Sequence, residues 1–306
     1  MSISICGSVA LDTLHTPEGK RDRILGGSAV HASLVACLFS DINIIGIVGQ
    51  DFPDKYKRLM EKKGISLEGL EESKGNTFYW EGSYLEDLNS AKTLKTELGV
   101  LENYMPKLSS KSAESKILFC ANSHPLTQLE AIRQSSSDFV ALDTMNLWID
   151  IALDDLKKVF SKINILFINE EEARQYVKTN NLYLAGKAIL AKNKQMQYVV
   201  IKKGEYGSML MGRDNDQVFM APAVPLEQVK DPTGAGDSFA GGFLGYLDAN
   251  ANNANTFTWD DLKNAIITGT AVSSFYVEEF GSDNALNITR EKVEERIDLL
   301  KRYTSI

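Results

Sequence analysis

Short hydrophobic runs rich in β-branched residues recur along the chain, and in the segments between them apolar residues return at helical spacing. The first pattern predicts buried strands, and the second predicts amphipathic helices. Their regular alternation is typical of an α/β fold in which helices cover a mostly parallel sheet. The predicted strands span residues 3–6, 43–48, 117–120, 139–143, 165–169 and 198–202.

Helical periodicity fills much of the chain between and after these strands. Two more apolar segments, residues 207–211 and 217–222, precede the last of the predicted helices. The predicted helices between the strands include residues 27–39, 54–64, 170–177 and 184–193, and three more follow near 237–248, 260–278 and 290–303.

One region breaks this rhythm. The segment GNTFYWEGSYL at residues 75–85 combines alternation with aromatic side chains, which predicts exposed antiparallel strands. Because the segment interrupts the succession of strands and helices, we expect a small sheet inserted over one end of the main domain.

Charge and cysteine content limit the partners and the compartment. The 306-residue chain has a formal net charge of −8, which argues against nucleic acid or an anionic membrane as the main partner. Cys6, Cys37 and Cys120 are far apart and form no metal-binding pair, so a reducing compartment is expected. The N-terminus lacks a signal-peptide pattern, and the apolar runs are too short to span a membrane. The sequence therefore predicts a cytoplasmic protein.

The segment DPTGAGDSFAGGF at residues 231–243 is the main candidate for chemistry. Gly234, Ala235 and Gly236 precede a predicted helix, where backbone N–H groups and the helix dipole favour a bound anion. An acid at Asp237 would repel phosphate unless it has a purpose, such as accepting a proton from an attacking hydroxyl. The alternative is that Asp237 only caps the helix. Neither a GxxxxGK[ST] loop nor a GxGxxG motif after the first strand is present.

The extended segment DPTGAGDSFAGGFLGYL resembles the C-terminal signature of the PfkB-type carbohydrate kinases, the ribokinase-like family. GSVALD at residues 7–12 and GGSAVHASLVACL at 26–38 resemble the family's substrate-binding turn and its di-glycine signature. Further matches follow in the family's order at residues 46–65, 169–173, 202–207 and 277–281.

The resemblance covers almost the whole chain and implies a single ribokinase-like kinase domain over residues 1–306. The fold it implies is a three-layer α/β/α sandwich with a mostly parallel central sheet. A small β-sheet lid would be inserted at about residues 12–25 and 75–105.

The activity implied by the resemblance is ATP-dependent phosphoryl transfer to a hydroxyl of a small sugar or sugar-like acceptor. Asp237 would accept the hydroxyl proton. The amides of Gly234, Ala235 and Gly236 would stabilise charge on the γ-phosphoryl group. Two alternatives stay open: a nucleoside kinase of the same family, and a non-catalytic sugar or nucleotide sensor on this fold.

On the nucleotide side, Asn169 and Glu172 match the family's NxxE motif, which organises phosphate, water and Mg²⁺. Glu172 would reach the metal through a water molecule. The alternative is an acidic first turn of a helix without a ligand, which the helix dipole also favours. The other ATP-binding candidates that the resemblance implies are Lys202, which stands where ribokinases often carry threonine, and Gly204, Gly207 and Gly269. Gly269 also fits the close packing of two helices.

On the acceptor side, Asp12 matches the family's substrate-holding acid. Gly26 and Gly27 would let the substrate meet bare backbone. The remaining candidates, at sugar-facing positions of the pattern, are Ser28, His31 and Asn122. His31 also fits a buried packing residue.

The resemblance further implies a monovalent-cation site. Family members often hold K⁺ between the DPTGAGD loop and the chain near Gly281. Asp231 and Thr233 stand at the matching positions, where their carbonyl groups would coordinate the ion.

Departures from the family pattern narrow the acceptor. Ala10, Ser28 and His31 replace residues that ribokinases use to bind ribose, and this disfavours ribose itself. The arginine of the family's DPNxR segment is missing from DTMNLW at residues 143–148, which disfavours a sugar acid or a sugar phosphate. Aromatic residues of the inserted sheet would stack on a sugar or nucleobase, or form a homodimer face: Phe78, Tyr79, Trp80 and Tyr84.

Overall fold

The computed structural model describes residues 2–85, 88, 91–214, 217–250 and 257–304. Its main sheet has the strand order β13-β12-β11-β10-β9-β8-β1-β4-β5, and only the β11–β12 and β12–β13 pairs are antiparallel. The strands are β1 (Ser2–Cys6), β4 (Asp41–Gly49), β5 (Ile65–Ser73), β8 (Ile117–Cys120), β9 (Phe139–Asp143), β10 (Ile165–Asn169), β11 (Tyr198–Lys202), β12 (Ser208–Gly212) and β13 (Val218–Ala221).

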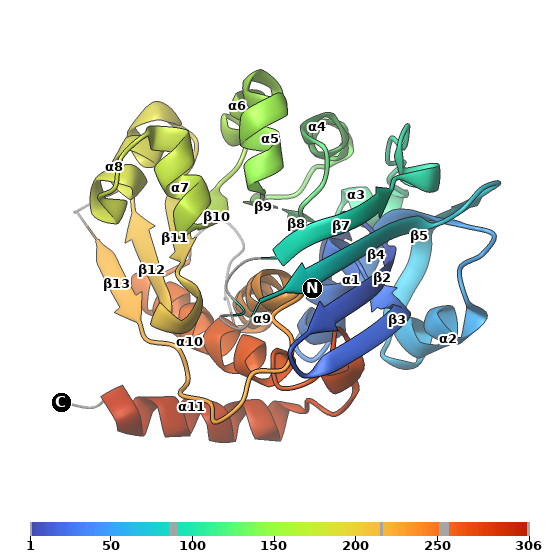
Figure 1. Ribbon diagram of the computed structural model, residues 1–306. Helices are drawn as coiled ribbons and strands as arrows, with labels where there is room; N and C mark the ends of the chain where they lie inside the picture. The colour runs from blue at the N-terminus through green and yellow to red at the C-terminus, as the bar shows by residue number, and fades with distance from the viewer. Residues whose placement is uncertain (1, 86–87, 89–90, 215–216, 251–256, 305–306) are drawn as a thin grey trace.

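Helices cover both faces of this sheet (Figure 1). One face packs on α1 (Ser28–Ala36), α9 (Ala235–Asn250) and α10 (Trp259–Tyr276), and the other packs on α4 (Pro125–Gln134), α6 (Leu153–Phe160), α7 (Glu170–Val177) and α8 (Leu182–Lys192). Strand alternation feeds the two cores: Ile117 and Phe119 of β8 enter one, and Leu118 and Cys120 enter the other. The three-layer α/β/α prediction is confirmed.

The described part of the chain has four further helices. They are α2 (Asp54–Lys62), α3 (Ser110–Ala113), α5 (Asn146–Ile151) and α11 (Arg290–Thr304), with 3₁₀ turns at Gly99–Leu101, Gly204–Tyr206 and Asp283–Leu286. Among the described residues, no helix combines the length and apolar character needed to cross a membrane. Cys6, Cys37 and Cys120 are all free.

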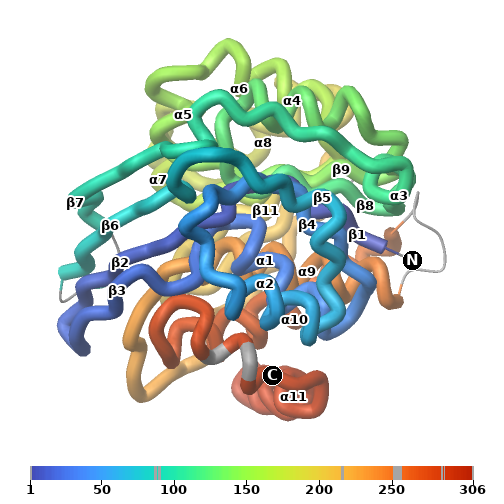
Figure 2. The backbone as a smooth tube through the Cα atoms, turned by 90° about the vertical axis from the view of Figure 1, so that its right-hand side faces the viewer, coloured from blue at the N-terminus to red at the C-terminus, as the bar shows by residue number. Residues whose placement is uncertain are grey.

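A second, smaller sheet stands out from the side of the main body (Figure 2). Its order is β3-β2-β6-β7, formed by β2 (Ala10–Thr16), β3 (Gly19–Gly26), β6 (Phe78–Tyr84) and β7 (Ala91–Glu97). The outer pairs are antiparallel as expected, but β2 and β6 are parallel. They follow β1 and β5, which run in the same direction in the main sheet, so both enter the small sheet from the same end. Residues 86–87 and 89–90 of the predicted lid lie outside the described part of the chain.

Two elements differ from the sequence-based expectation. Strand β5 was not predicted, because its mixed sequence ISLEGLEES forms the edge of the sheet and lacks a continuous apolar run. Helix α9 begins at Ala235 rather than near residue 237, so Gly236 and Asp237 belong to its first turn. This shift matters for the chemistry, because the acid lies inside the helix.

Candidate active site

The predicted catalytic segment lies where several elements end. The carboxyl ends of parallel strands form one edge of an open sheet, and ligands of doubly wound folds bind outside that edge. Asp143, Asn169 and Lys202 are the last residues of β9, β10 and β11. The first turn of α9 meets Lys202 at Gly236. The structure therefore brings the predicted nucleotide side and the predicted catalytic segment together.

Two glycines of this segment allow close contacts that a side chain would block. Gly234 has a φ of +76°, and a Cβ atom there would lie 2.5 Å from Cγ of His31. A Cβ atom on Gly236 would lie 2.8 Å from Nζ of Lys202. The loop therefore lies between His31, a predicted acceptor-side residue, and Lys202, a predicted nucleotide-side residue. The amide of Ala235 donates to the carbonyl oxygen of Pro232 at 3.0 Å, so this amide already has a protein partner.

Asp237 is the third residue of α9 and is half-buried. Because it lies inside the helix, it is not the N-cap residue, so the capping alternative does not describe its position. Burial raises the pKa of Asp237 well above its usual range, Asp143 and Asp12 raise it further, and Lys202 opposes them. A raised pKa makes a carboxylate a stronger proton acceptor.

Lys202 forms a close ion pair with Asp143. The distance from Nζ to Oδ2 is 2.5 Å, and the side chain of Asp143 is only 4% exposed. Oδ1 of Asp143 accepts a hydrogen bond from the amide of Thr144 at 2.8 Å. Burial alone lowers the pKa of Lys202, but the neighbouring Asp143, Glu172 and Asp237 raise it, and the overall shift is upward. The lysine is therefore charged. Asp143 was not a predicted site residue, although an acid at the end of a buried strand was a visible signal.

Asn169 and Glu172 close on one another as a capping box at the start of α7. Oε2 of Glu172 accepts from the amide of Asn169 at 2.9 Å, and Oε1 accepts from Nδ2 of Asn169 at 2.7 Å. The amide of Glu172 donates to Oδ1 of Asn169 at 2.8 Å. Burial raises the pKa of Glu172 to about 7. The motif therefore begins a helix, as the alternative interpretation without a ligand states.

The donor set also bears on Mg²⁺. Within the described residues, no group of three or more His, Cys, Asp or Glu side chains could hold a metal ion. Mg²⁺ keeps several waters and needs few protein carboxylates when phosphate oxygens supply the rest. Each oxygen of Glu172 accepts one hydrogen bond from Asn169, which leaves lone pairs for a metal-bound water. The residues fit a Mg²⁺ ion that arrives with ATP.

Asp12, a predicted acceptor-binding residue, lies in β2. The residue is 4% exposed, and a Cβ atom on Gly26 would lie 1.8 Å from its Oδ2 atom, so only glycine fits beside it. Burial raises the pKa of Asp12 to about 7, Asp231 raises it too, and a backbone hydrogen bond from Gly27 opposes them. Gly27 has a φ of +98° and begins the turn into α1.

His31 lies 4.0 Å from Asp12, measured between Nε2 and Oδ2. Its Nδ1 atom is 2.5 Å from the hydroxyl of Tyr276, and the two rings meet edge to face. Nε2 is buried and has no hydrogen-bond partner. Burial lowers the pKa of His31 to about 4, so the imidazole is neutral. Sequence reasoning missed Tyr276, which is 245 positions away from His31 along the chain.

Ser28 and Asn122 are held by protein partners. Oγ of Ser28 donates to the carbonyl oxygen of Asn122 at 2.8 Å and accepts from the amide of Ser8 at 3.2 Å. Oδ1 of Asn122 accepts from Nε1 of Trp148 at 2.9 Å, and its Nδ2 faces Sδ of Met145 at 3.2 Å. Both residues join the ends of β1 and β8 to α1 and α5.

The segments of the predicted K⁺ site are joined by Asp231. Its buried carboxylate accepts from the amide of Thr233 at 2.9 Å and from the amide of Gly281 at 2.7 Å. Gly281 has a φ of +49°. Oγ1 of Thr233 donates to the hydroxyl of Tyr84 at 3.0 Å, so β6 of the small sheet touches the glycine-rich loop.

The remaining predicted nucleotide residues differ in their surroundings. Gly204 has a φ of +53° and open space beside it, whereas a Cβ atom on Gly207 would lie 2.0 Å from the carbonyl oxygen of Ala221. A Cβ atom on Gly269 would lie 2.7 Å from the carbonyl oxygen of Phe239 in α9. Gly269 therefore lies where α10 packs against α9, which agrees with the alternative interpretation of this glycine as a helix-packing residue.

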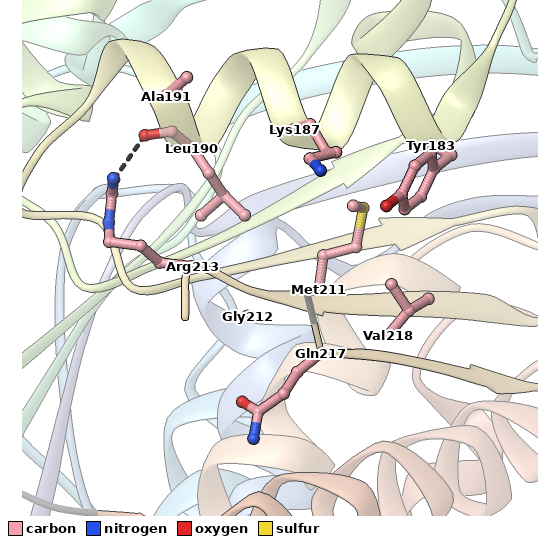
Figure 3. A pocket seen from close by; sticks show the side chains of 9 residues that line it. All are labelled: Tyr183, Lys187, Leu190, Ala191, Met211, Gly212, Arg213, Gln217 and Val218. Atoms are coloured by element: carbon pink, nitrogen blue, oxygen red, sulfur yellow. Dashed lines mark hydrogen bonds between the residues drawn. The ribbon is translucent and has the colours of Figure 1, made fainter. Parts of the chain in front are cut away.

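A cavity of about 210 Å³ lies away from these residues, between α8 and the β12–β13 strands (Figure 3). Its lining includes Tyr183, Lys187, Met211 and Arg213, and none of the predicted site residues. The guanidinium of Arg213 is bonded to backbone carbonyls, among them that of Leu190.

Comparison with known proteins gives a consistent result. Residues 10–289 match the model of the pfkB family carbohydrate kinases. A cytidine kinase from Thermococcus kodakarensis is 26% identical over 250 residues, which cover 80% of this chain and 87% of the relative. The solved structure of a nucleoside kinase from Methanocaldococcus jannaschii, described as an archaeal member of the ribokinase family, has a TM-score of 0.78 at 22% identity and covers 97% of this chain and 98% of that one. A ribokinase structure from Thermotoga maritima has a TM-score of 0.76 at 20% identity, with coverage of 97% and 99%.

Proposed function

Because the chain belongs to the pfkB family of carbohydrate kinases, we propose that it is a nucleoside kinase that transfers the γ-phosphoryl group of ATP to a sugar hydroxyl of a nucleoside. The observation that carries this proposal is the contact of Gly234 with His31, which is itself 4.0 Å from Asp12. This contact supports the proposal because it brings the proposed acceptor-binding pair, Asp12 and His31, next to the glycine-rich loop. The names of the relatives from Thermococcus kodakarensis and Methanocaldococcus jannaschii support a nucleoside over a free sugar.

On the phosphoryl side, Asp237 accepts the proton of the attacking hydroxyl. The amides of Gly234 and Gly236 and the dipole of α9 stabilise charge on the phosphoryl oxygens. Lys202, Gly204 and Gly207 bind the nucleotide, with Asn169 and Glu172 beside the phosphates. Mg²⁺, when bound, neutralises phosphate charge, and Glu172 holds one of its waters.

On the acceptor side, Asp12 accepts hydrogen bonds from two sugar hydroxyls. The unpartnered Nε2 atom of His31 binds an oxygen of the same sugar, because an oxygen about 2.8 Å from each group fits between atoms that are 4.0 Å apart. Gly26 and Gly27 let the substrate approach. Ser28 fixes the position of the β1–β2 turn through Ser8, and Asn122 joins Ser28 to Trp148.

The small sheet serves as a lid over the acceptor, within a single kinase domain. Register partners share a face, so Trp80 lies on the same face of the sheet as Asp12. The bond between Tyr84 and Thr233 connects that face to the glycine-rich loop. The exposed edge strands β3 and β7 also suit a homodimer, since unpaired strand edges favour pairing.

A K⁺ ion beside the loop completes the proposal, held by backbone carbonyls near Asp231, Thr233 and Gly281. We expect turnover in K⁺ to exceed turnover in a bulky organic cation at equal ionic strength. Equal initial rates in K⁺, Na⁺ and the organic cation would remove this ion from the proposal.

The experiment that tests the function is an ADP-release assay with cytidine, uridine, adenosine, inosine, ribose and fructose as acceptors. We expect one or more nucleosides to be converted to a monophosphate in a one-to-one ratio with ADP. Turnover with a free sugar alone would point to a carbohydrate kinase. ADP release independent of every acceptor would contradict phosphoryl transfer to these compounds.

A further inference from the structure

We propose that Lys202 is a catalytic residue that changes partner during the reaction, from Asp143 in the free enzyme to the γ-phosphoryl group of bound ATP. Asp143 is the positioning residue that aims the lysine before ATP binds. The proposal rests on the proposed kinase function and deepens it, because it assigns one cation to the transferred group and distinguishes ATP from ADP.

The position of the ammonium group carries the first step. Nζ of Lys202 lies 2.8 Å from where a Cβ atom on Gly236 would be, so it touches the first turn of α9. The first amides of a helix have no partner within the helix and point toward a bound anion. A phosphoryl group bound at those amides would therefore be within reach of the lysine. A Cβ atom on residue 236 would displace Nζ from this place, so glycine lets the ammonium group lie against the helix.

Charge balance carries the second step. The carboxylates of Asp143, Glu172 and Asp237 all act on Lys202. A triphosphate that approaches three acids is repelled unless cations compensate. Lys202 is a fixed, charged group already in that cluster, and its side chain is 18% exposed, which leaves a path for a ligand. An ammonium group also stabilises the charge that develops on the phosphoryl oxygens in the transition state.

The pairing with Asp143 explains why the lysine is ready before ATP arrives. A buried lysine without a counterion would lose its proton or turn toward solvent. Asp143 is held in turn by the amide of Thr144, so the Oδ2 atom faces Nζ at a defined place. When the phosphoryl group replaces Asp143 as the partner, the carboxylate is left beside the nucleotide and the cation that accompanies it.

The chemical step balances without an added reagent. The bond between the acceptor oxygen and Pγ forms, and the bond between Pγ and the β-γ bridging oxygen breaks. The hydroxyl proton goes to Asp237, ADP leaves with the bond's electron pair, and Lys202 keeps its proton throughout. The lysine therefore contributes charge rather than acid–base chemistry.

Binding measurements without turnover test this assignment. Calorimetry would compare the affinities of wild type and Lys202→Met for ADP and for a non-hydrolysable ATP analogue. We expect Lys202→Met to lose about tenfold or more in affinity for the ATP analogue, because a charged contact to the γ-phosphoryl group is gone, and to change its affinity for ADP by no more than about twofold. We also expect kcat to fall by about 10²–10³.

Two further variants and a control sharpen the result. Lys202→Arg keeps the charge and should retain most of the preference for the ATP analogue over ADP. Asp143→Asn should keep that preference while kcat falls by about tenfold, because the lysine is present but poorly aimed. Lys57→Met removes a lysine from an ion pair of the same 2.5 Å length with Glu72, outside the site, and should change none of these quantities.

The proposal is overturned if Lys202→Met weakens ADP and the ATP analogue equally, or if its kcat stays within about threefold of wild type. If Lys202→Met does not fold, the Lys202→Arg and Asp143→Asn variants decide, and loss of the ATP preference in Lys202→Arg overturns the proposal. Failure of the nucleoside assignment is separable, because it appears in the acceptor panel and leaves nucleotide binding unchanged.

Discussion

The two sides of the site handle charge in opposite ways. On the acceptor side of the proposed site, burial raises the pKa of Asp12 to about 7 and lowers the pKa of His31 to about 4, so near neutral pH Asp12 is partly protonated and His31 is uncharged. On the phosphoryl side, Lys202 stays charged among the carboxylates of Asp143 and Glu172 and beside Asp237. Gly234 and Gly236 separate the two sides with bare backbone.

This difference teaches how each side selects its ligand. A buried pair in which His31 is uncharged discriminates by hydrogen bonds, because an unmatched polar group left buried is costly. A charged cluster discriminates by net charge and responds to whatever cations accompany the nucleotide. Variants on the acceptor side should therefore change binding of the acceptor, and variants on the phosphoryl side should change turnover.

The largest effect is expected from Asp237→Asn. The amide keeps the shape of the side chain but accepts no proton, so kcat should fall by about 10²–10⁴ while ATP affinity changes little. Steady-state kinetics with calorimetry would measure both quantities. Turnover above about a tenth of wild type would remove Asp237 from its role as the proton acceptor.

The second largest effect is expected from Asp12→Ala, on the binding of the acceptor. Loss of a carboxylate that holds two hydroxyls should weaken acceptor affinity by about 2–4 kcal/mol and spare ATP. Asp22→Ala on the neighbouring strand β3 is the matched control, because this carboxylate accepts from Oγ1 of Thr13 at 2.8 Å and lies 4.0 Å from Nζ of Lys20. Equal acceptor KM values for Asp12→Ala and wild type would contradict the assignment.

The pKa of Asp12 predicts a pH dependence of acceptor binding. The ionised carboxylate accepts both hydroxyl protons, so acceptor affinity should rise about tenfold per pH unit up to about pH 7 and then level off. His31 stays neutral over that range, and the other acids near Asp12 are Asp231 and Asp237. Calorimetry with acceptor alone avoids titration of Glu172 on the nucleotide side. A flat profile in wild type, or an unchanged slope in Asp12→Asn, would show that another group controls binding.

The upward direction of the pKa shift of Asp12 also determines how this residue affects the stability of the fold. The pKa of Asp12 is raised in the folded state, so its protonated form is favoured by folding. Its contribution to stability is present below the unfolded value and is lost as pH rises toward about 7. Acceptor binding and fold stability should therefore respond to Asp12 in opposite directions over the same pH range.

The smallest expected effect concerns the lid. Replacement of Phe78 and Trp80 by Ser should raise acceptor KM by a few-fold, and the ratio of ATP hydrolysed to acceptor phosphorylated should climb, because the lid excludes water. Light scattering would report any change of oligomeric state. An unchanged oligomer together with unchanged KM and hydrolysis ratio would contradict both the lid and the dimer role.

Local pattern predicted the main sheet well because buried strands leave a local signature. The runs ILFC, FVALD and ILFIN became β8, β9 and β10 with their predicted bounds. Strand β5 was not predicted because an edge strand has fewer buried positions and its apolar and polar residues alternate little. The parallel β2–β6 pair depends on how two distant crossovers enter the small sheet, which no local window records.

The site was predicted as a set of motifs rather than as a set of contacts. Asp12, His31, Lys202 and Asp237 were all named from sequence, but their partners were not. Asp143 and Lys202 are 59 positions apart, and His31 and Tyr276 are 245 apart, so both pairs exist only after the sheet and α10 assemble. Gly269 shows the converse, since its position in a motif matched the family while its surroundings are those of a helix contact.

The division between the two sides is tested most directly by the single-turnover rate of phosphoryl transfer at saturating acceptor. Wild type, Asp12→Ala and Asp237→Asn would be mixed in excess over labelled ATP and quenched on the millisecond scale. The account predicts that Asp12→Ala transfers within about tenfold of wild type once acceptor saturates, whereas Asp237→Asn stays slower by about 10²–10⁴. A wild-type rate in Asp237→Asn, or an equally slow rate in both variants at saturation, would contradict it.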